Sequence, residues 1–205
     1  PGGSVRYTKY RIPLRQGLQT YKLNIKPDKR NTDPNANESG VRPILMPDYI
    51  GEVYPFRYCE LEGYNGFLHT HDITRNSVNY PFDNGASWFS SNDTILNQVW
   101  NLCKHSIQAT SFCGVYVDGD RERIPYEADA YINQLSHYGT DLEFTMARYS
   151  VDYLMEWPTW PTEWIMQSIL MLWNDYIYTG DTTLLQRHYD SLHARTLSAL
   201  TDSIG

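Results

Sequence analysis

The segment DGDRERIPYEAD, residues 118–129, holds five carboxylates and two arginines in twelve positions, although only 20% of the chain is charged. Like charges at this density shift one another's pKa values, so such a segment is either solvated or organised for proton chemistry. A pair of carboxyl groups can cleave a glycosidic bond: a protonated one donates to the leaving oxygen, and the other acts as nucleophile or activates water. The segment therefore contains candidate groups for general acid catalysis.

The backbone conformation of this segment decides which carboxylates lie together. In an extended chain the side chains alternate, so Asp118, Asp120 and Glu122 would share one side. Arg121 and Arg123 would then share the other side. Carboxylates on one side of a strand lie about 7 Å apart, close enough in a partly dry cleft to raise the pKa of one of them. This arrangement requires the connection before the helix to be extended.

The end of the segment is expected to begin a helix. A proline ring fits the first helical turn, and Glu127 and Asp129, which follow Pro125, would lie at the positive end of the helix dipole. An ordinary solvated loop before a capped helix also accounts for the charges, because charged runs usually face water. A structural network of ion pairs between helices is a further explanation.

Metal binding is a weaker interpretation of two segments. Four acidic residues occupy positions 1, 3, 5 and 12 of a loop of the EF-hand type, namely Asp118, Asp120, Glu122 and Asp129. However, the required glycine at position 6 is replaced by Arg123, and two cations lie inside the loop. The HTHD run from His69 to Asp72 lacks a third ligand. We therefore expect no metal and no other cofactor.

The composition of the 205 residues favours a neutral or small partner. Seventeen tyrosines and six tryptophans offer flat apolar faces with hydrogen-bonding edges, which suit sugars, although such rings mostly fill cores. The net charge of −7 argues against a nucleic acid or an anionic membrane, and no apolar run is long enough for a membrane span. Cys59, Cys103 and Cys113 have neither disulfide-framework nor zinc spacing, although one pair could bridge.

The chain divides into a β half and an α half. Near-alternating residues predict strands at 5–14, 19–26 and 55–64 within a domain 1–88, which contains a polar, mobile surface loop at 26–40. Helical spacing predicts an all-α part at 89–205, with the first helix capped by Ser91, Asn92 or Asp93. The helices are predicted at 93–109, 126–138, 141–156, 162–178 and 182–202, with breaks at YGTD, WPTWP and TGD.

A resemblance to a known family emerges from these segments. The run VDGDRERIPYEAD followed by AYINQLSHYGTD resembles the acidic motif of the glycoside hydrolase family 78 α-L-rhamnosidases. Upstream, PFRYCELEGY and SWFSSNDTILNQVWNLCKHSIQATS are similar to the last strand of that family's β-sandwich and the first helix of its (α/α)6 barrel. The resemblance implies a β-sandwich portion followed by the opening helices of a barrel that is incomplete in this chain. The sequence begins without a leader, so we expect it to be an excised piece.

The resemblance also implies roles for individual residues. Glu122 takes the place of the general acid of an inverting mechanism, and the general base would lie outside this chain. Sugar hydroxyls would be held by Asp118, Arg121 and Asp129, Tyr126 replaces a ring-stacking tryptophan, and Trp160 and Glu163 are further candidates for lining the cleft.

The predicted function is the inverting hydrolysis of terminal α-L-rhamnosides, with a rhamnose-containing oligosaccharide or glycoside as partner. An apolar wall of aromatic rings would suit the methyl group of this 6-deoxy sugar. Two alternatives stay open: another inverting glycosidase with the same barrel, and a non-catalytic carbohydrate-binding protein. A bacterial periplasmic or extracellular location is expected from the acidic, aromatic-rich composition with few cysteines.

Overall fold

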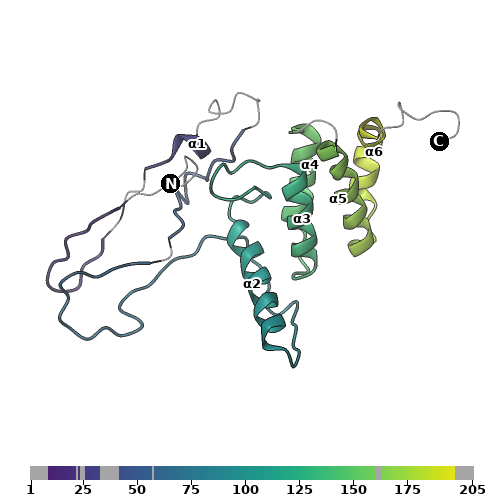
Figure 1. Ribbon diagram of the computed structural model, residues 1–205. Coiled ribbons are helices and arrows are strands. Elements are labelled where there is room, and N and C mark those ends of the chain that lie inside the picture. The colour runs from purple at the N-terminus through teal and green to yellow at the C-terminus, as the bar shows by residue number, and fades with distance from the viewer. Residues whose placement is uncertain are drawn as a thin grey trace, which may run out of the picture.

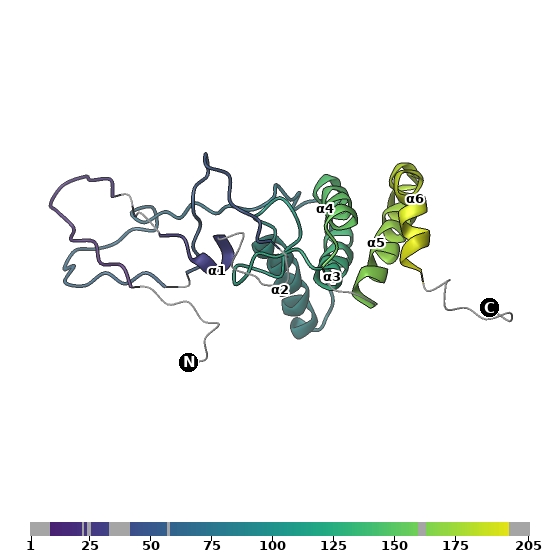
Figure 2. The same ribbon diagram turned by 90° about the horizontal axis from the view of Figure 1, so that it is seen from above.

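The protein is described here by a computed structural model, which places residues 9–21, 23, 26–32, 42–56, 58–159 and 163–196. The helices in these ranges are α1 (Lys29–Thr32), α2 (Thr94–Thr110), α3 (Glu127–Tyr138), α4 (Thr145–Glu156), α5 (Glu163–Thr179) and α6 (Thr183–Arg195). Helices α2 to α6 lie on one side of the molecule, and the long irregular chain before α2 lies on the other (Figure 1). Seen from above, α2 lies nearest the irregular part, α3 and α4 lie side by side beyond it, and α5 and α6 lie farthest away (Figure 2).

The predicted helices are confirmed to within a few residues, except at one start and one end. The helix predicted from 141 begins at Thr145, with Phe144 as its N-cap, and the carboxylate of Glu143 accepts the Thr145 backbone N–H at 2.9 Å. The last predicted helix, 182–202, ends at Arg195, and residues 197–205 lie outside the described residues.

The predicted start of α2 and the predicted end of α5 have the expected local geometry. Asp93 caps α2, since its Oδ1 accepts the backbone N–H groups of Ile95 and Leu96. Gly180 ends α5 with a φ of +69°, a conformation that glycine adopts without the Cβ clash of other residues. The next residue, Asp181, accepts the N–H of Thr183 at 2.9 Å, and hydrogen bonds from Thr183 lower the pKa of Asp181 to about 2.

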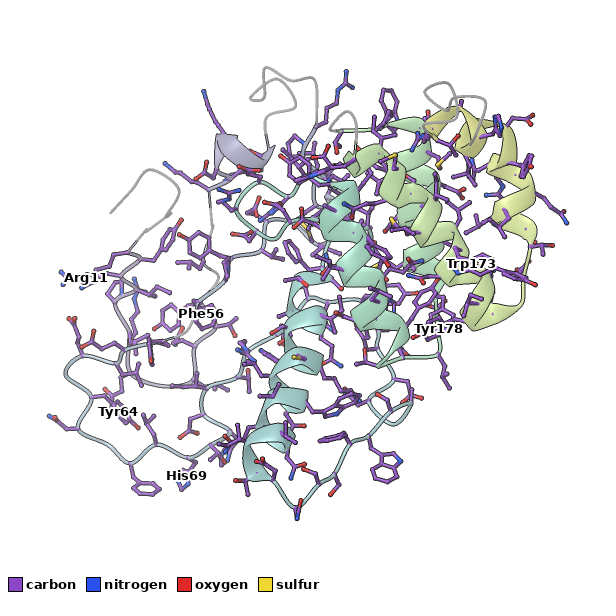
Figure 3. All side chains as sticks on the ribbon, turned by 45° about the vertical axis from the view of Figure 1, so that its right-hand side comes forward. Arg11, Phe56, Tyr64, His69, Trp173 and Tyr178 are labelled. Atoms are coloured by element: carbon purple, nitrogen blue, oxygen red, sulfur yellow. The ribbon has the colours of Figure 1, made fainter. Side chains whose placement is uncertain are left out.

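The predicted β-sandwich strands are not found in the described residues. Where residues 9–88 are described, the backbone is irregular apart from the single turn α1, so the strands expected at 5–14, 19–26 and 55–64 are corrected to irregular chain over their described parts. A strand needs a neighbouring strand for its backbone N–H and C=O groups and a core for its apolar face. Here large apolar residues such as Leu14, Leu18 and Tyr58 are exposed, and Figure 3 shows Phe56 and Tyr64 in the same irregular region.

The polar loop predicted at 26–40 contains a short helix in its described part. Helix α1 is a single turn, in which the Thr32 hydroxyl donates to the Asp28 carbonyl at 2.6 Å. Residues 33–41 lie outside the described residues, so the mobility predicted for this loop stays a prediction, as does the division of the chain at residue 88.

The core lies between the helices, chiefly where α3 packs on α5 and α5 packs on α4 and α6. Small residues on facing helices, Ala130 and Ala147, have no exposed surface and allow close approach. The core consists of Ile107, Tyr116, Ala130, Tyr138, Met146, Ala147, Val151, Leu154, Met171, Leu172, Leu184 and Leu192, with Tyr80 and Phe82 of the irregular chain packed against it. Among the described residues, none of the helices is both long and apolar enough to span a membrane.

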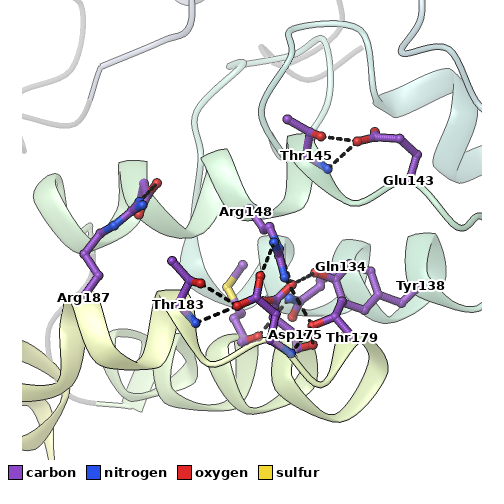
Figure 4. A network of polar contacts seen from close by, with 12 residues as sticks. Gln134, Tyr138, Glu143, Thr145, Arg148, Asp175, Thr179, Thr183 and Arg187 are labelled. Atoms are coloured by element: carbon purple, nitrogen blue, oxygen red, sulfur yellow. Dashed lines mark hydrogen bonds and ion pairs between the residues drawn. The ribbon is translucent and has the colours of Figure 1, made fainter.

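A buried carboxylate joins three of these helices. Asp175 of α5 accepts hydrogen bonds through Oδ1 from the hydroxyl of Tyr138 at 2.7 Å and from Nε of Arg148 at 3.0 Å. Nη1 of Arg148 also donates to Asp181 at 2.9 Å, in the connection to α6 (Figure 4). A buried polar group needs such hydrogen-bond partners, so this network holds the relative positions of α3, α4 and α5.

The packing of α5 yields a stability prediction. Leu172 has no exposed surface, so Leu172→Ala should open a cavity and lower the free energy of unfolding by about 2–5 kcal/mol. Leu170→Ala on the same helix is the matched control: Leu170 is 44% exposed, and its loss should cost less than about 1 kcal/mol. Urea denaturation followed by circular dichroism measures both, and equal losses would contradict this packing.

Candidate active site

The acidic segment forms a tight loop, so the extended conformation in which Asp118, Asp120 and Glu122 would share one side is not adopted. The N–H of Asp118 donates to the carbonyl of Ile124 at 3.0 Å, and the N–H of Arg123 donates to the carbonyl of Gly119 at 3.1 Å. Gly119 has a φ of 129° and Arg123 a φ of 57°, so the chain reverses between them. The alternation expected for an extended strand therefore does not apply.

The reversal sorts the charged side chains differently from the prediction. Arg121 lies with Asp118 and Glu122, since its Nη2 is 3.0 Å from Oε1 of Glu122 and 3.7 Å from Oδ2 of Asp118. Asp120 lies apart from these carboxylates and binds Arg123 instead. The acidic group that the sequence placed on one side is thus reduced to Asp118 and Glu122, with Arg121 between their charges.

Asp118 is the more enclosed of the two carboxylates. Its side chain is 10% exposed and that of Glu122 is 32% exposed. Burial raises the pKa of Asp118 to about 6; the hydrogen bond from the Ile124 N–H opposes this shift, the negative charges of Glu122 and Asp129 add to it, and Arg121 opposes it. The pKa of Asp118 is therefore about two units above that of an exposed aspartate.

Asp129 belongs to the same electrostatic group. It lies in the first turn of α3, as predicted, and burial followed by the charge of Glu122 raises its pKa, while its own backbone N–H and Arg121 lower it. Three carboxylates thus influence one another around a single exposed guanidinium.

Tyr126 connects this group to α5. Its hydroxyl donates to Oε2 of Glu122 at 3.1 Å, and its ring meets that of Trp164 edge to face, with centroids 5.8 Å apart. Burial and the neighbouring Glu122 raise the pKa of the Tyr126 hydroxyl, so it stays a hydrogen-bond donor. Trp164 was not among the predicted site residues, although it directly follows Glu163, which was.

The second arginine of the segment is completely buried. Arg123 has no exposed side-chain surface, and its Nη2 donates to Asp120 at 2.7 Å and to Glu52 at 2.5 Å. Glu52 lies 71 residues earlier in the chain, and no spacing rule in the sequence could have indicated this contact. This burial contradicts the solvated-loop interpretation. The ion pairs of Arg123 are structural, but they join two irregular segments and not two helices, as the alternative interpretation had it.

The loop leads into α3 close to the predicted position. Helix α3 begins at Glu127 with Tyr126 as its N-cap, so Pro125 precedes the helix instead of lying within its first turn. Glu127 is fully buried, and its carboxylate accepts hydrogen bonds from the backbone N–H (2.9 Å) and the hydroxyl of Thr159. The first turn of α3 thereby holds the connection between α4 and α5 beside the acidic loop.

The roles predicted for Trp160 and Glu163 in lining the cleft stay predictions. Trp160 lies outside the described residues. Glu163 is the first residue of α5 and its side chain is exposed, whereas its neighbour Trp164 makes the contact with Tyr126.

The metal interpretations gain no support from the geometry. Within the described ranges, no group of three or more His, Cys, Asp or Glu side chains is arranged to hold a metal ion. At the place where a calcium loop requires glycine, the guanidinium of Arg123 binds Asp120, one of the four supposed ligands. His69 and His71 stack with ring centroids 5.3 Å apart on an exposed turn.

The comparison with protein families agrees with this helical part. Residues 84–203 match the family model described as bacterial alpha-L-rhamnosidase 6 hairpin glycosidase domain. The chain belongs to this family. No curated protein and no solved structure matched the chain. The six-hairpin glycosidase domain match covers α2 to α6 and the whole acidic loop, and it confirms the family resemblance that this loop indicated.

Membership of the six-hairpin glycosidase domain family connects the loop to carbohydrate chemistry. The matched region contains Asp118, Arg121, Glu122, Tyr126 and Asp129 together, whereas Glu52 lies before it. The roles predicted for these residues in sugar binding and proton transfer stay predictions.

The charges around Asp118 yield a prediction about its pKa. Glu122→Gln should lower the pKa of Asp118, because it removes a neighbouring negative charge, and Arg121→Gln should raise it, because it removes the opposing positive one. Carbon-13 NMR titration of the Asp118 carboxyl measures both. The control is Asp190→Asn, at an exposed position of α6. Shifts of equal sign in the two variants would contradict the charge arrangement.

The same group yields a prediction about stability and pH. The pKa of Asp118 rises from 3.8 to about 6, so the folded state holds this proton more tightly, and the group's contribution to stability falls as pH rises from about 4 to 6. Asp118→Asn keeps an acceptor for the Ile124 N–H and removes this loss. The difference in stability between the variant and the wild type should therefore favour the variant more at pH 7 than at pH 4. Thermal denaturation at the two pH values tests this, and a constant difference would refute it.

Proposed function

We propose that the protein is part of an inverting α-L-rhamnosidase in which Glu122 is the general acid. The supporting observation is that Asp118, Arg121, Glu122 and Tyr126 gather in one loop of a domain that belongs to the α-L-rhamnosidase six-hairpin glycosidase family. Glu122 is partly exposed and can contact a substrate, and the more buried Asp118 beside it adds a carboxyl group with a raised pKa.

The contacts of Glu122 suit the step in which it gives up its proton. As the proton passes to the glycosidic oxygen, negative charge forms on the Glu122 carboxylate. Arg121, 3.0 Å from Oε1, and the Tyr126 hydroxyl, 3.1 Å from Oε2, stabilise that charge. The C–O bond to the departing group then breaks, and water attacks the anomeric carbon from the opposite face.

The second carboxylate of the reaction completes the proposal. An inverting enzyme needs a general base about 6.5–9.5 Å from the acid, with room for a water molecule between them. We assign this base to a residue outside the present chain, in the remainder of an (α/α)6 barrel of which these helices are the opening part. The chain alone should accordingly hydrolyse little or nothing.

Substrate binding is assigned to the neighbours of Glu122. Asp118 and Asp129 offer oxygens for sugar hydroxyl groups, and the Tyr126 and Trp164 rings offer an apolar surface that suits the methyl group of L-rhamnose. Hydrolysis of a panel of aryl glycosides separates this substrate class from the sugars of other glycosidases with the same barrel. Sugar binding without turnover would instead favour a carbohydrate-binding protein.

The decisive variant is Glu122→Gln in the full-length enzyme. Its turnover of a rhamnose-containing disaccharide should fall by a factor of about 10² or more, since general acid assistance is typically worth 10²–10⁴. Its turnover of a nitrophenyl rhamnoside should fall much less, because that leaving group needs little protonation. Steady-state kinetics with both substrates measures this, and Asp190→Asn is the control with normal rates.

The outcome also identifies the proton donor. If Asp118→Asn shows this leaving-group dependence and Glu122→Gln does not, the acid is Asp118, the residue whose pKa burial raises to about 6. If neither variant shows it, the assignment of this loop to general acid catalysis is wrong.

A further inference from the structure

The residue that follows Glu122 is held more firmly than any other charged residue of the loop. Arg123 has no exposed side-chain surface. Its Nη2 donates to Glu52 at 2.5 Å, to Asp120 at 2.7 Å and to the Val53 carbonyl at 3.3 Å, and its Nε donates to Asp120 at 3.1 Å. Its guanidinium also lies over the Phe112 ring, 5.4 Å from the centroid.

The backbone of Arg123 is fixed by the same two segments. Its N–H donates to the carbonyl of Gly119 at 3.1 Å within the loop, and its carbonyl accepts the N–H of Ile44 at 2.8 Å from the early irregular segment. Its φ of 57° is unfavourable for a residue with a Cβ and persists only where the surroundings hold it. The side chain and both backbone groups of Arg123 are therefore restrained together.

The electrostatics of this contact depend on Glu52. Burial alone would lower the pKa of the Arg123 guanidinium, but the hydrogen bonds to Glu52 and Asp120 raise it above its ordinary value. Burial also raises the pKa of the Cys113 thiol nearby, to about 12. Glu52 is itself only 12% exposed, and its Oε1 also accepts the Val53 N–H at 3.1 Å. Loss of Glu52 would leave a buried charge with one carboxylate fewer.

We propose that Glu52 and Arg123 are positioning residues for Glu122. Glu52 holds the guanidinium of Arg123, the guanidinium holds the strained backbone at 123, and this backbone sets the direction of the adjoining Glu122 carboxyl group. The segment 44–53, which lies before the glycosidase domain match, is thus a support of the acidic loop. This inference rests on the proposed function of Glu122.

A positioning role differs from a purely structural one in its dependence on the leaving group. A variant that only unfolds part of the protein lowers the rates on all substrates together. A variant that misplaces the acid lowers the rate most where the leaving oxygen needs a proton, and a displacement of about 1 Å can cost up to roughly 100-fold. The ratio of kcat on a rhamnosyl disaccharide to kcat on nitrophenyl rhamnoside reports this difference and does not depend on the folded fraction.

The test is Glu52→Ala in the full-length enzyme, measured with both substrates. The kcat ratio should fall about 10- to 100-fold, with KM for the disaccharide changed less than threefold. Glu52→Gln, which keeps an oxygen acceptor for the guanidinium, should restore part of the ratio. Glu62→Ala is the matched control, because Glu62 forms an exposed pair with Arg11 at 3.9 Å in the same irregular part, and its ratio should equal that of wild type.

The double variant Glu52→Ala with Glu122→Gln completes the experiment. Once Glu122 is replaced, Glu52→Ala should lower the ratio no further. An unchanged ratio in Glu52→Ala, while Glu122→Gln changes it, overturns the positioning role and leaves the general acid assignment intact. An unchanged ratio in Glu122→Gln overturns that assignment and the positioning role with it. Additive effects in the double variant overturn the positioning role alone.

Discussion

A guanidinium without exposed surface keeps its charge only if carboxylates replace the water around it, and the acidic loop is built on this constraint. Arg123 binds Asp120 of the loop and Glu52 of the early irregular segment, both through Nη2. The loop must reverse at Gly119 and Arg123 for this to happen, and the reversal directs Asp118 and Glu122 toward Arg121. The buried Arg123 therefore separates Asp120, which it binds, from Asp118 and Glu122, which lie beside Arg121.

The five carboxylates of the segment meet different surroundings, which explains why so many acidic residues can be close together. Asp120 is neutralised by Arg123, and Glu127 accepts hydrogen bonds from Thr159. Burial beside like charges raises the pKa of Asp118 and of Asp129. Glu122 stays partly exposed, with Arg121 and Tyr126 as partners. Repulsion is thus limited by pairing, and the repulsion that stays is expressed in the raised pKa values of Asp118 and Asp129.

The helices that carry this loop could be predicted because their determinants are local. A cap such as Asp93 acts within three residues, and the apolar spacing of a helix is read over one or two turns. The strands failed for the opposite reason. Alternation at 55–64 shows which residues would suit a strand, but a strand exists only beside a partner and over a core, and the described residues supply neither there.

The amino-acid sequence by itself determined the helical spans, the place of the acidic loop directly before α3, and the likeness to rhamnosidases, since all three depend on residues near one another in the chain. Only the tertiary structure decided which acidic residues share a site. The pairing of Arg123 with Glu52 joins residues 71 positions apart, and the contact of Tyr126 with Trp164 joins two helix starts. The pKa of Asp118 follows from the same cause, because desolvation depends on which distant atoms exclude water from a side chain.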